Sequence, residues 1–350
     1  MNHLTFRRQF LLSSQSVKTL PHWNQEVLGK YTLYTHQDLA RFRTSGKTAE
    51  AILLGHVLDP KDYARTEVDI LNDLVALPTV ENISEILYSL SGRFVLIVRI
   101  GERMLFFNDA CGLRSFFYTE DGGALQLASQ PLLLKLAVGD KVAQGARYKS
   151  FFESAYGQKK ETYIPSGTSL YEGVYHLVPN HFLDSSTMQQ ERYWPKEPHA
   201  LKEYKPSLEK FTTLLQQILV TGAKKYKLAL GVTAGFDSRI ILSASKPVKD
   251  TMLYYTLKYR DMTHKSRDIR IPSKLNDIMQ FNHQVYNCQI PIDEEFIKVY
   301  AQNSDMAHVD DWGFIAYGIS QNLPKDRMAI KGSCSETGRC YFYKSGQHPN

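Results

Sequence analysis

The stretch LALGVTAGFDSRIIL, residues 228–242, constrains the fold of this chain more than any other. Its first five residues are apolar and rich in small or branched side chains, as in a buried strand, and DSRIILSAS carries apolar residues at helical spacing. A strand that passes into a helix through a few small residues is typical of parallel sheets covered by helices. Ligands of such sheets bind beyond the carboxyl ends of the strands, so we expect a site at this turn.

The rest of the C-terminal half repeats the alternation of strand and helix. Further strands are expected at 252–259, 281–287 and 327–332. Helices are expected at 207–222 with Ser207 as cap, at 267–275 with an interruption at Pro272, and at 312–323. This order predicts an α/β domain with a parallel sheet.

The N-terminal half differs in texture, because its apolar runs follow one another at hairpin spacing. Strands are expected at 49–58, 92–100, 103–110 and 124–129. Two helices are expected between the first two strands, at 66–77 and at 82–92, the second with Asn82 or Ser84 as cap and Gly92 as stop. Antiparallel strands with a few helices packed on them predict an α+β sandwich.

The segment between residues 193 and 207 is rich in proline and charge and lacks periodicity. We interpret it as a linker, which predicts domains at 1–200 and 201–350. With 350 residues the chain is long enough for two domains that each bury a core.

Composition excludes several classes of function. No apolar run approaches the roughly 20 residues that cross a bilayer, and the short apolar run near the N-terminus has neither the length nor the cleavage site of a signal peptide. A cytoplasmic location is therefore expected, without a membrane partner. The net charge of +6 is scattered, so no nucleic-acid partner is expected. Assembly into a homo-oligomer stays open.

The cysteines show no CxxC pair and no regular spacing. Reduced thiols are therefore expected. Cys334, Cys340 and His348 match no zinc spacing, and Cys111 is expected to pack within the strand region.

The turn Thr233–Ser238 has the chemistry of a phosphate site. Small residues let backbone amides approach an anion, and the helix that follows adds its N-terminal N–H groups. The hydroxyls of Thr233 and Ser238 can donate to phosphate oxygens, whereas Asp237 would need a bridging Mg²⁺. A plain turn in which Asp237 is only an N-cap is the alternative.

This hexapeptide resembles the Ser-Gly-Gly-x-Asp-Ser loop of the N-type ATP pyrophosphatases, and its flanks are similar to the asparagine synthetase family. Residues 253–268 resemble the family's second strand and loop, and residues 329–343 resemble its third, which usually ends in Gly-Glu-Gly-Ser-Asp-Glu. The resemblance implies ATP contacts at Val232, Thr233, Ala234, Gly235, Ser238, Arg239, Leu257, Asp268, Lys331 and Gly332. It implies catalytic carboxylates and Mg²⁺ ligands at Asp237 and Glu336, where Glu336 replaces the family's aspartate.

The roles of Arg239 and of the pair Asp310 and Asp311 each have two possible interpretations from the sequence. Arg239 either neutralises a phosphate or lies exposed on the helix face. Asp310 and Asp311 form either an N-cap pair, which we favour, or a site that recognises an amine.

The N-terminal half resembles the family's amidotransferase domain at residues 92–118, 127–134 and 169–194. The resemblance implies an Ntn-hydrolase-like αββα sandwich followed by an adenine nucleotide hydrolase-like (PP-loop) domain. The glutaminase groups are replaced, however. Asn2 stands at the position of the nucleophilic cysteine, Leu54-Gly55-His56 at the Asn-Gly-Glu loop, and Asn108 at an arginine, so we predict no glutaminase activity.

The resemblance implies an ATP-dependent ligase that activates a small-molecule carboxylate as an acyl-adenylate and releases AMP and pyrophosphate when an amine attacks. A catalytically inactive homologue that binds nucleotide or serves in assembly is the main alternative. A sulfur- or tRNA-modifying relative is a weaker one. Family members continue well past the third loop, so the chain is expected to be a fragment or a shortened version.

Overall fold

A computed structural model describes residues 3–18, 20–158, 164, 167–198, 200, 202–305, 312–333 and 335. The chain forms two compact units. The first comprises Met1–Leu58, Arg65–Ala200 and Ala301–Met306, and the second comprises Asp59–Ala64, Leu201–Tyr300 and Ala307–Asn350. The main division falls between Ala200 and Leu201, and two short segments are exchanged between the units. Within the described ranges, no helix combines the length and apolarity that a bilayer crossing requires.

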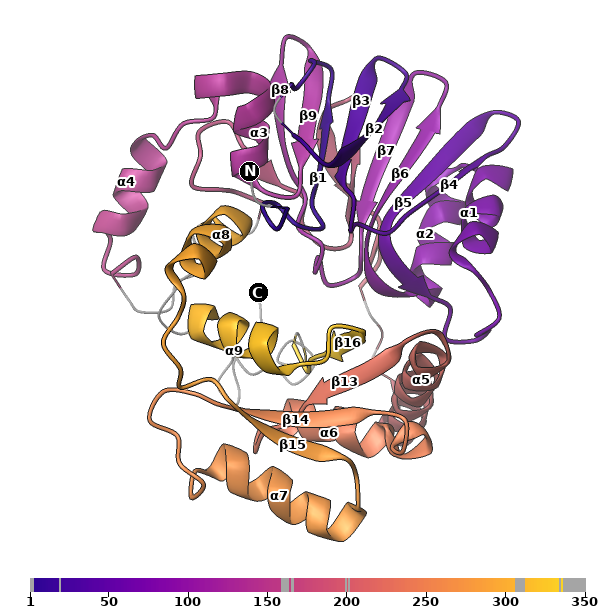
Figure 1. Ribbon diagram of the computed structural model, residues 1–350. Coiled ribbons are helices and arrows are strands. Elements are labelled where there is room, and N and C mark those ends of the chain that lie inside the picture. The colour runs from indigo at the N-terminus through magenta and orange to yellow at the C-terminus, as the bar shows by residue number, and fades with distance from the viewer. Residues whose placement is uncertain are drawn as a thin grey trace. The chain divides into compact units, whose positions relative to one another are not determined.

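The first unit contains two antiparallel sheets (Figure 1). One has the order β10 (Tyr175–His176), β8 (Phe117–Asp121), β9 (Ala124–Ala128), β1 (Phe10–Ser13), β3 (Tyr31–His36) and β2 (Trp23–Leu28). The other has the order β12 (Gln189–Arg192), β11 (His181–Asp184), β7 (Arg103–Asn108), β6 (Ser91–Ile100), β5 (Ala49–Leu58) and β4 (Arg41–Ser45). The helices are α1 (Glu67–Ala76), α2 (Val80–Ser89), α3 (Pro131–Val138) and α4 (Ala146–Glu153).

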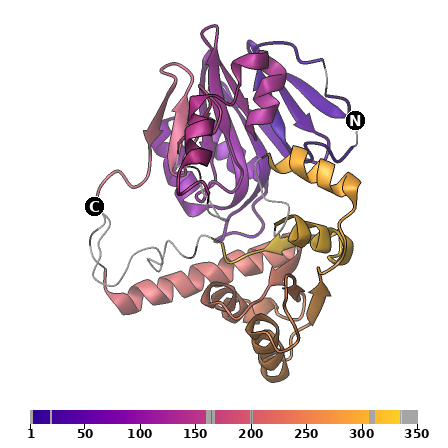
Figure 2. The same cartoon turned by 90° about the vertical axis from the view of Figure 1, so that its left-hand side faces the viewer.

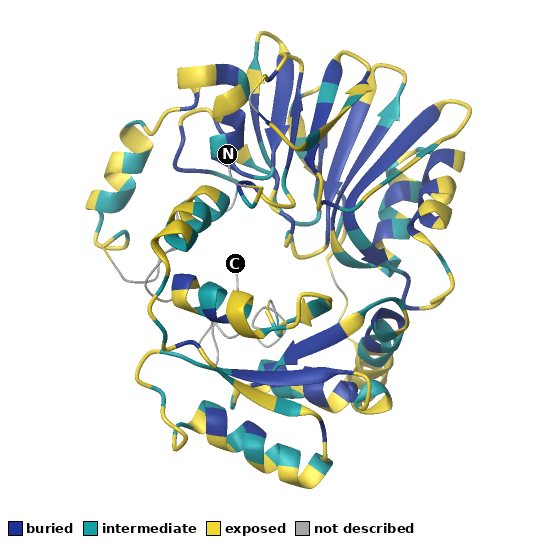
Figure 3. Cartoon of the chain, viewed as in Figure 1, coloured by how far each residue is buried: buried dark blue, intermediate teal, exposed yellow. Residues whose placement is uncertain are grey.

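The two sheets are stacked on each other, with helices on their outer faces. Each central strand contributes to two cores, because alternate residues of a strand face opposite sides. In β5, Ile52 and Leu54 join the core between the sheets, whereas Ala51 and Leu53 join a second core beneath α1 and α2. A third core lies between the other sheet and α3. Both faces of the central strands are therefore buried, as Figure 3 shows, and the expected antiparallel α+β layers are confirmed.

The helix expected at 82–92 begins earlier than the sequence indicates. α2 starts at Val80 because Thr79 is the N-cap, and its side chain accepts a hydrogen bond from the N–H of Asn82 at 3.3 Å. The predicted caps at Asn82 and Ser84 are therefore wrong. Gly92 does not end the helix but lies in β6 at φ +151°, a conformation that glycine adopts readily.

The second unit contains a parallel sheet of order β15 (His283–Asn287), β14 (Leu253–Lys258), β13 (Lys227–Gly231) and β16 (Arg327–Ile330). All three strand pairings are parallel, as expected from the alternation of strand and helix. Its helices are α5 (Tyr204–Lys225), α6 (Phe236–Ala244), α7 (Arg267–Met279), α8 (Glu294–Ser304) and α9 (Phe314–Asn322). The last residues of α8 belong to the first unit.

Two helix boundaries in this unit correct the sequence analysis. α5, seen lengthwise in Figure 2, has Glu203 as N-cap, so Ser207 lies inside the helix. Pro206 sits in the first turn, where a missing N–H costs nothing. α7 runs through Pro272 without interruption, and the burial of this ring on the helix offsets part of the lost hydrogen bond.

Candidate functional site

The loop after β13 begins at a residue that is fixed from two sides. Val232 is fully buried, and its N–H donates to the carbonyl of Tyr255 at 2.8 Å. Its own carbonyl accepts from the Thr256 hydroxyl at 2.8 Å. Because that hydroxyl has only one proton, its 2.9 Å contact with Nε2 of His283 requires His283 to be the donor. Thr256 is not among the residues predicted from the sequence. The only sign of its role there is that it is a polar residue in an apolar strand.

The loop itself is closed by its two hydroxyl side chains. Oγ of Ser238 accepts from the N–H of Thr233 at 3.0 Å and lies 3.2 Å from Oγ1 of Thr233. Oγ1 of Thr233 accepts in turn from the N–H of Gly235 at 3.1 Å. The two hydroxyl oxygens therefore accept hydrogen bonds from two backbone N–H groups of the loop.

The first turn of α6 follows at once. Its N-cap is Gly235 and Asp237 is its second residue, so the interpretation of Asp237 as the N-cap is wrong. A glycine has no side chain with which to cap the helix, and the N–H groups of the first turn of a helix have no intrahelical partner. Gly235 has φ −67°, so the backbone does not require glycine here. A small residue instead keeps the approach to these N–H groups open.

A carboxylate from α7 reaches the same loop. Oδ1 of Asp268 accepts from the N–H of Ala234 at 2.9 Å. The residue expected on the second strand and loop is thus in direct contact with the first. Leu257, also expected there, lies at the carboxyl end of β14, where it pairs with Tyr286 of β15.

The segment after β16 lies against the start of α6. A Cβ atom placed on Gly332 would lie 2.9 Å from the carbonyl carbon of Asp237 and 3.0 Å from the nitrogen of Ser238. Lys331 precedes it and is exposed. All three chain segments expected at the site are therefore brought together at one end of the parallel sheet (Figure 1). Glu336 lies outside the described residues, as do Asp310 and Asp311.

Arg239 turns back on its own helix. Its Nε donates to the carbonyl of Gly235 at 3.2 Å, and its guanidinium lies over the ring of Phe236 at 4.8 Å from the ring centre. Phe236 itself is 68% exposed. In this geometry the arginine stabilises the turn, and its charge lies beside the first turn of α6.

Asp237 and Asp268 are the carboxylates that lie at the described part of this loop. Among the residues that the structure describes, no group of three or more His, Cys, Asp or Glu side chains could hold a metal ion. Mg²⁺ commonly binds through one or two carboxylates together with substrate phosphates and waters. Asp237 offers one carboxylate to such a partial donor set, and Oδ1 of Asp268 accepts from the N–H of Ala234.

The structure describes some of the positions at which the resemblance implies replaced glutaminase groups. Asn108 is buried, and its Nδ2 donates to the carbonyl of Leu177 at 3.0 Å. Burial, followed by the positive charge of Arg114, lowers the pKa of His56. Cys111 is exposed in the turn after β7, so the prediction that it packs among strands is wrong. Asn2 lies outside the described residues, as do Cys334, Cys340 and His348.

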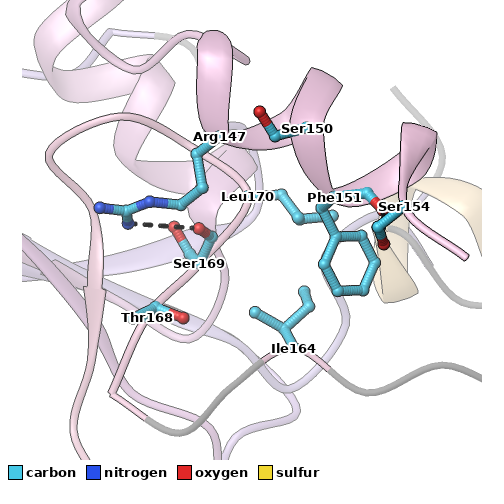
Figure 4. A pocket seen from close by; sticks show the side chains of 8 residues that line it. All are labelled: Arg147, Ser150, Phe151, Ser154, Ile164, Thr168, Ser169 and Leu170. Atoms are coloured by element: carbon cyan, nitrogen blue, oxygen red, sulfur yellow. Dashed lines mark hydrogen bonds between the residues drawn. The ribbon is translucent and has the colours of Figure 1, made fainter. Parts of the chain in front are cut away.

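A hollow of about 380 Å³ lies elsewhere, in the first unit (Figure 4). Its lining residues are Arg147, Ser150, Phe151, Ser154, Ile164, Thr168, Ser169 and Leu170. Arg147 is held by the carbonyl of Ser169 at 3.5 Å. Among the described residues, its lining contains no carboxylate and no histidine, and none of the residues expected to bind nucleotide belongs to it.

No protein-family model matches this chain, and no curated protein matches it. Among solved structures, it is similar to a glutamine phosphoribosylpyrophosphate amidotransferase from B. subtilis, complexed with ADP and GMP. The match has 10% identity and a TM-score of 0.35, covering 99% of this chain and 92% of the other. A second is described as the allosteric regulatory enzyme of purine biosynthesis, with 12% identity, a TM-score of 0.34 and coverage of 99% and 91%. Likeness at this level assigns neither a family nor an activity.

Proposed function

We propose that the second unit binds ATP at the loop Thr233–Ser238 and that the chain is an ATP-dependent, AMP-forming carbon–nitrogen ligase of asparagine synthetase type. The observation that carries the proposal is the convergence of three separate segments on the start of α6. Asp268 contacts Ala234, and Gly332 lies against Asp237 and Ser238. Such a place, at the carboxyl end of a parallel sheet and at a helix N-terminus, suits a phosphate group.

In the proposed reaction a substrate carboxylate attacks the α-phosphorus of ATP, and pyrophosphate leaves. The N–H groups of the first turn of α6 and the hydroxyls of Thr233 and Ser238 would hold the departing pyrophosphate. Catalysis of this kind depends on positioning and on stabilisation of developing charge. Mg²⁺, held by Asp237 and by Glu336, would offset the negative charge of the phosphates.

The amine is proposed to come from solution or from the substrate itself. The position of the nucleophilic cysteine holds Asn2, whose amide is not a nucleophile for a carboxamide. We therefore expect no release of glutamate from glutamine.

Exchange of labelled pyrophosphate into ATP, measured with aspartate and with other carboxylates, tests the proposal. Carboxylate-dependent exchange is expected in the natural chain, together with a loss of at least about 100-fold in Asp237→Asn. Asp250→Asn, at an exposed position shortly after α6, is the matched control and should exchange normally. Exchange that is equally fast in both variants would contradict the role of Asp237.

One observation favours a second candidate, a homologue that binds nucleotide without catalysis. The N–H groups of Thr233, Ala234 and Gly235 are all occupied by side-chain oxygens. A loop whose N–H groups are already paired in this way offers fewer donors to stabilise a departing pyrophosphate, which favours binding without catalysis. Saturable ATP binding without any exchange, over a broad set of carboxylates, would select this candidate over the ligase.

A further inference from the structure

Three arginines of the first unit come together from distant parts of the chain. Nη1 of Arg114 donates to the carbonyl of Arg8 at 3.0 Å, and its Nε lies 3.5 Å from the carbonyl of Arg93. Nε of Arg93 donates to the carbonyl of Leu113 at 3.0 Å. Arg114 is nine-tenths buried, although buried charges in proteins are usually paired.

Unlike several other arginines of the same unit, these three have no acidic partner among the described residues. A carboxylate lies within ion-pair distance of Arg7, Arg41, Arg43, Arg65, Arg99 and Arg103. Within the described ranges, none of Arg8, Arg93 and Arg114 forms such a pair. Arg147 and Arg192 of this unit, which are exposed, also form no such pair among the described residues, so what distinguishes this cluster is the burial of Arg114.

Asp109, the acidic group that acts to raise the pKa of Arg114, is already saturated with hydrogen bonds. Asp109 is buried, and its two oxygens accept from the N–H groups of Phe94, Cys111, Leu113 and Arg114. A carboxylate offers about four lone-pair positions, so these four bonds leave none for a guanidinium. Asp38, the acidic group that acts on Arg8, is paired with Arg7 at 2.6 Å.

The chain preserves the space that the buried guanidinium needs. Gly55 of β5 has φ +122°, and a Cβ atom there would lie 2.9 Å from Nε of Arg114 and 2.2 Å from the carbonyl oxygen of Arg93. Only glycine permits this approach. Burial, followed by the charges of Arg93 and Arg8, lowers the pKa of Arg114 to about 10, although Asp109 acts in the opposite direction. Arg114 is therefore still protonated at neutral pH, within electrostatic reach of two other cations.

We propose that Arg8, Arg93 and Arg114 form a binding site for a divalent oxyanion, either a phosphate group or a dicarboxylate, in the first unit. Guanidinium groups match the geometry of both anions through paired N–H donors. Arg114 supplies Nη2, which has no hydrogen-bond partner among the described residues, while its Nε and Nη1 contact backbone carbonyls. The site is independent of the nucleotide loop and would stand if the proposed ligase activity failed.

Equilibrium binding of inorganic phosphate and of succinate to the full chain, at low ionic strength, tests the site. We expect saturable binding of at least one of the two, weakened at least fivefold in Arg8→Gln and in Arg93→Gln. The better-bound anion identifies the ligand class. Arg192→Gln removes the same charge from an exposed position of β12 and should bind as the natural chain does.

Three outcomes would overturn the inference. They are no saturable binding of either anion, equal affinity in the natural chain and in both arginine variants, or an equal loss in Arg192→Gln. Arg114→Gln is also informative where circular dichroism shows that it folds, and it should lose binding more completely than the other two variants.

Discussion

Oδ1 of Asp268 accepts the backbone hydrogen bond of Ala234 at 2.9 Å, across 34 residues of sequence. One residue lies in α7 and the other in the loop that precedes α6. A carboxylate oxygen thus accepts a hydrogen bond from a backbone N–H group of the kind that binds phosphate at the start of a helix. The contact fixes the loop. It also places a negative charge where it repels any anion that enters the loop.

Substitution Asp268→Asn separates these two effects. The asparagine carbonyl can still accept from Ala234, whereas the negative charge is gone. We expect metal-free pyrophosphate to bind at least fivefold more tightly, which corresponds to about 1 kcal/mol. Titration calorimetry in the presence of a chelator measures the change. Asp277→Asn, at an exposed position of the same helix, is the control, and weaker binding in Asp268→Asn would show that the carboxylate assists the anion.

Substitution Ser238→Ala should open the loop. The Ser238 side chain is buried and accepts from the N–H of Thr233, so its removal leaves that donor without its partner. Such a loss costs about 1–3 kcal/mol of unfolding free energy. Urea denaturation should show the loss, and amide exchange of Thr233 should accelerate. Ser243→Ala, exposed on the same helix, should change stability by no more than about 0.5 kcal/mol, and a similar loss in both variants would contradict the role of the Ser238 hydroxyl.

The sequence predicts some buried strands, such as β5 and β6, but it misses others, including the buried interior strands β1 and β3 and the edge strand β4. β5 and β6 are continuous apolar runs, whereas β4 is RFRTS and is largely exposed. Its place at the edge of a sheet depends on pairing with β5 and on Arg43, which bonds to Glu26 and Glu50. Charged edge strands are common because they prevent further pairing. Their own residues carry no periodic signal.

The candidate site likewise has a part that the sequence predicts and a part that it does not. The turn Thr233–Ser238 is recognisable from its local composition, because a strand, small residues and a helix follow directly in the chain. Its contacts with Asp268 and Gly332 depend on how α7 and β16 pack, and no local pattern specifies such packing. The N-cap of α6 shows most clearly what the local sequence does not predict. Asp237 is the better capping residue, yet the N-cap lies two residues earlier, at Gly235.

Substitution Asp305→Asn should alter the pH dependence of stability in the first unit. Burial raises the pKa of Asp305, although the Tyr171 hydroxyl donates to its Oδ1 at 2.8 Å. A raised pKa in the folded state means that the stability contributed by Asp305 is complete below its unfolded pKa. That contribution is lost as the pH rises through the folded value. Asparagine stays neutral, accepts the same hydrogen bond and tolerates the backbone φ of +50°.

Urea denaturation across a pH series checks this prediction. The variant should be more stable than the natural chain near neutral pH, and the two should converge at acidic pH, below the unfolded pKa of about 3.9. Asp140→Asn, at a fully exposed side chain of the same unit, should show no such divergence. A constant difference at every pH would show that titration of Asp305 is not the cause.

Substitution Gly332→Ala tests whether the segment after β16 must lie against the start of α6. The added Cβ would meet backbone atoms of Asp237 and Ser238 at 2.9–3.0 Å, and backbone cannot rotate away as a flexible side chain can. We expect a loss of about 1–3 kcal/mol in unfolding free energy, and ATP binding at least tenfold weaker because the N–H groups of the first turn of α6 would shift. Gly231→Ala is the matched control, since its Cβ would lie 3.5 Å from the Tyr255 ring, an ordinary contact. Normal ATP binding by Gly332→Ala would mean that this segment lies outside the nucleotide site.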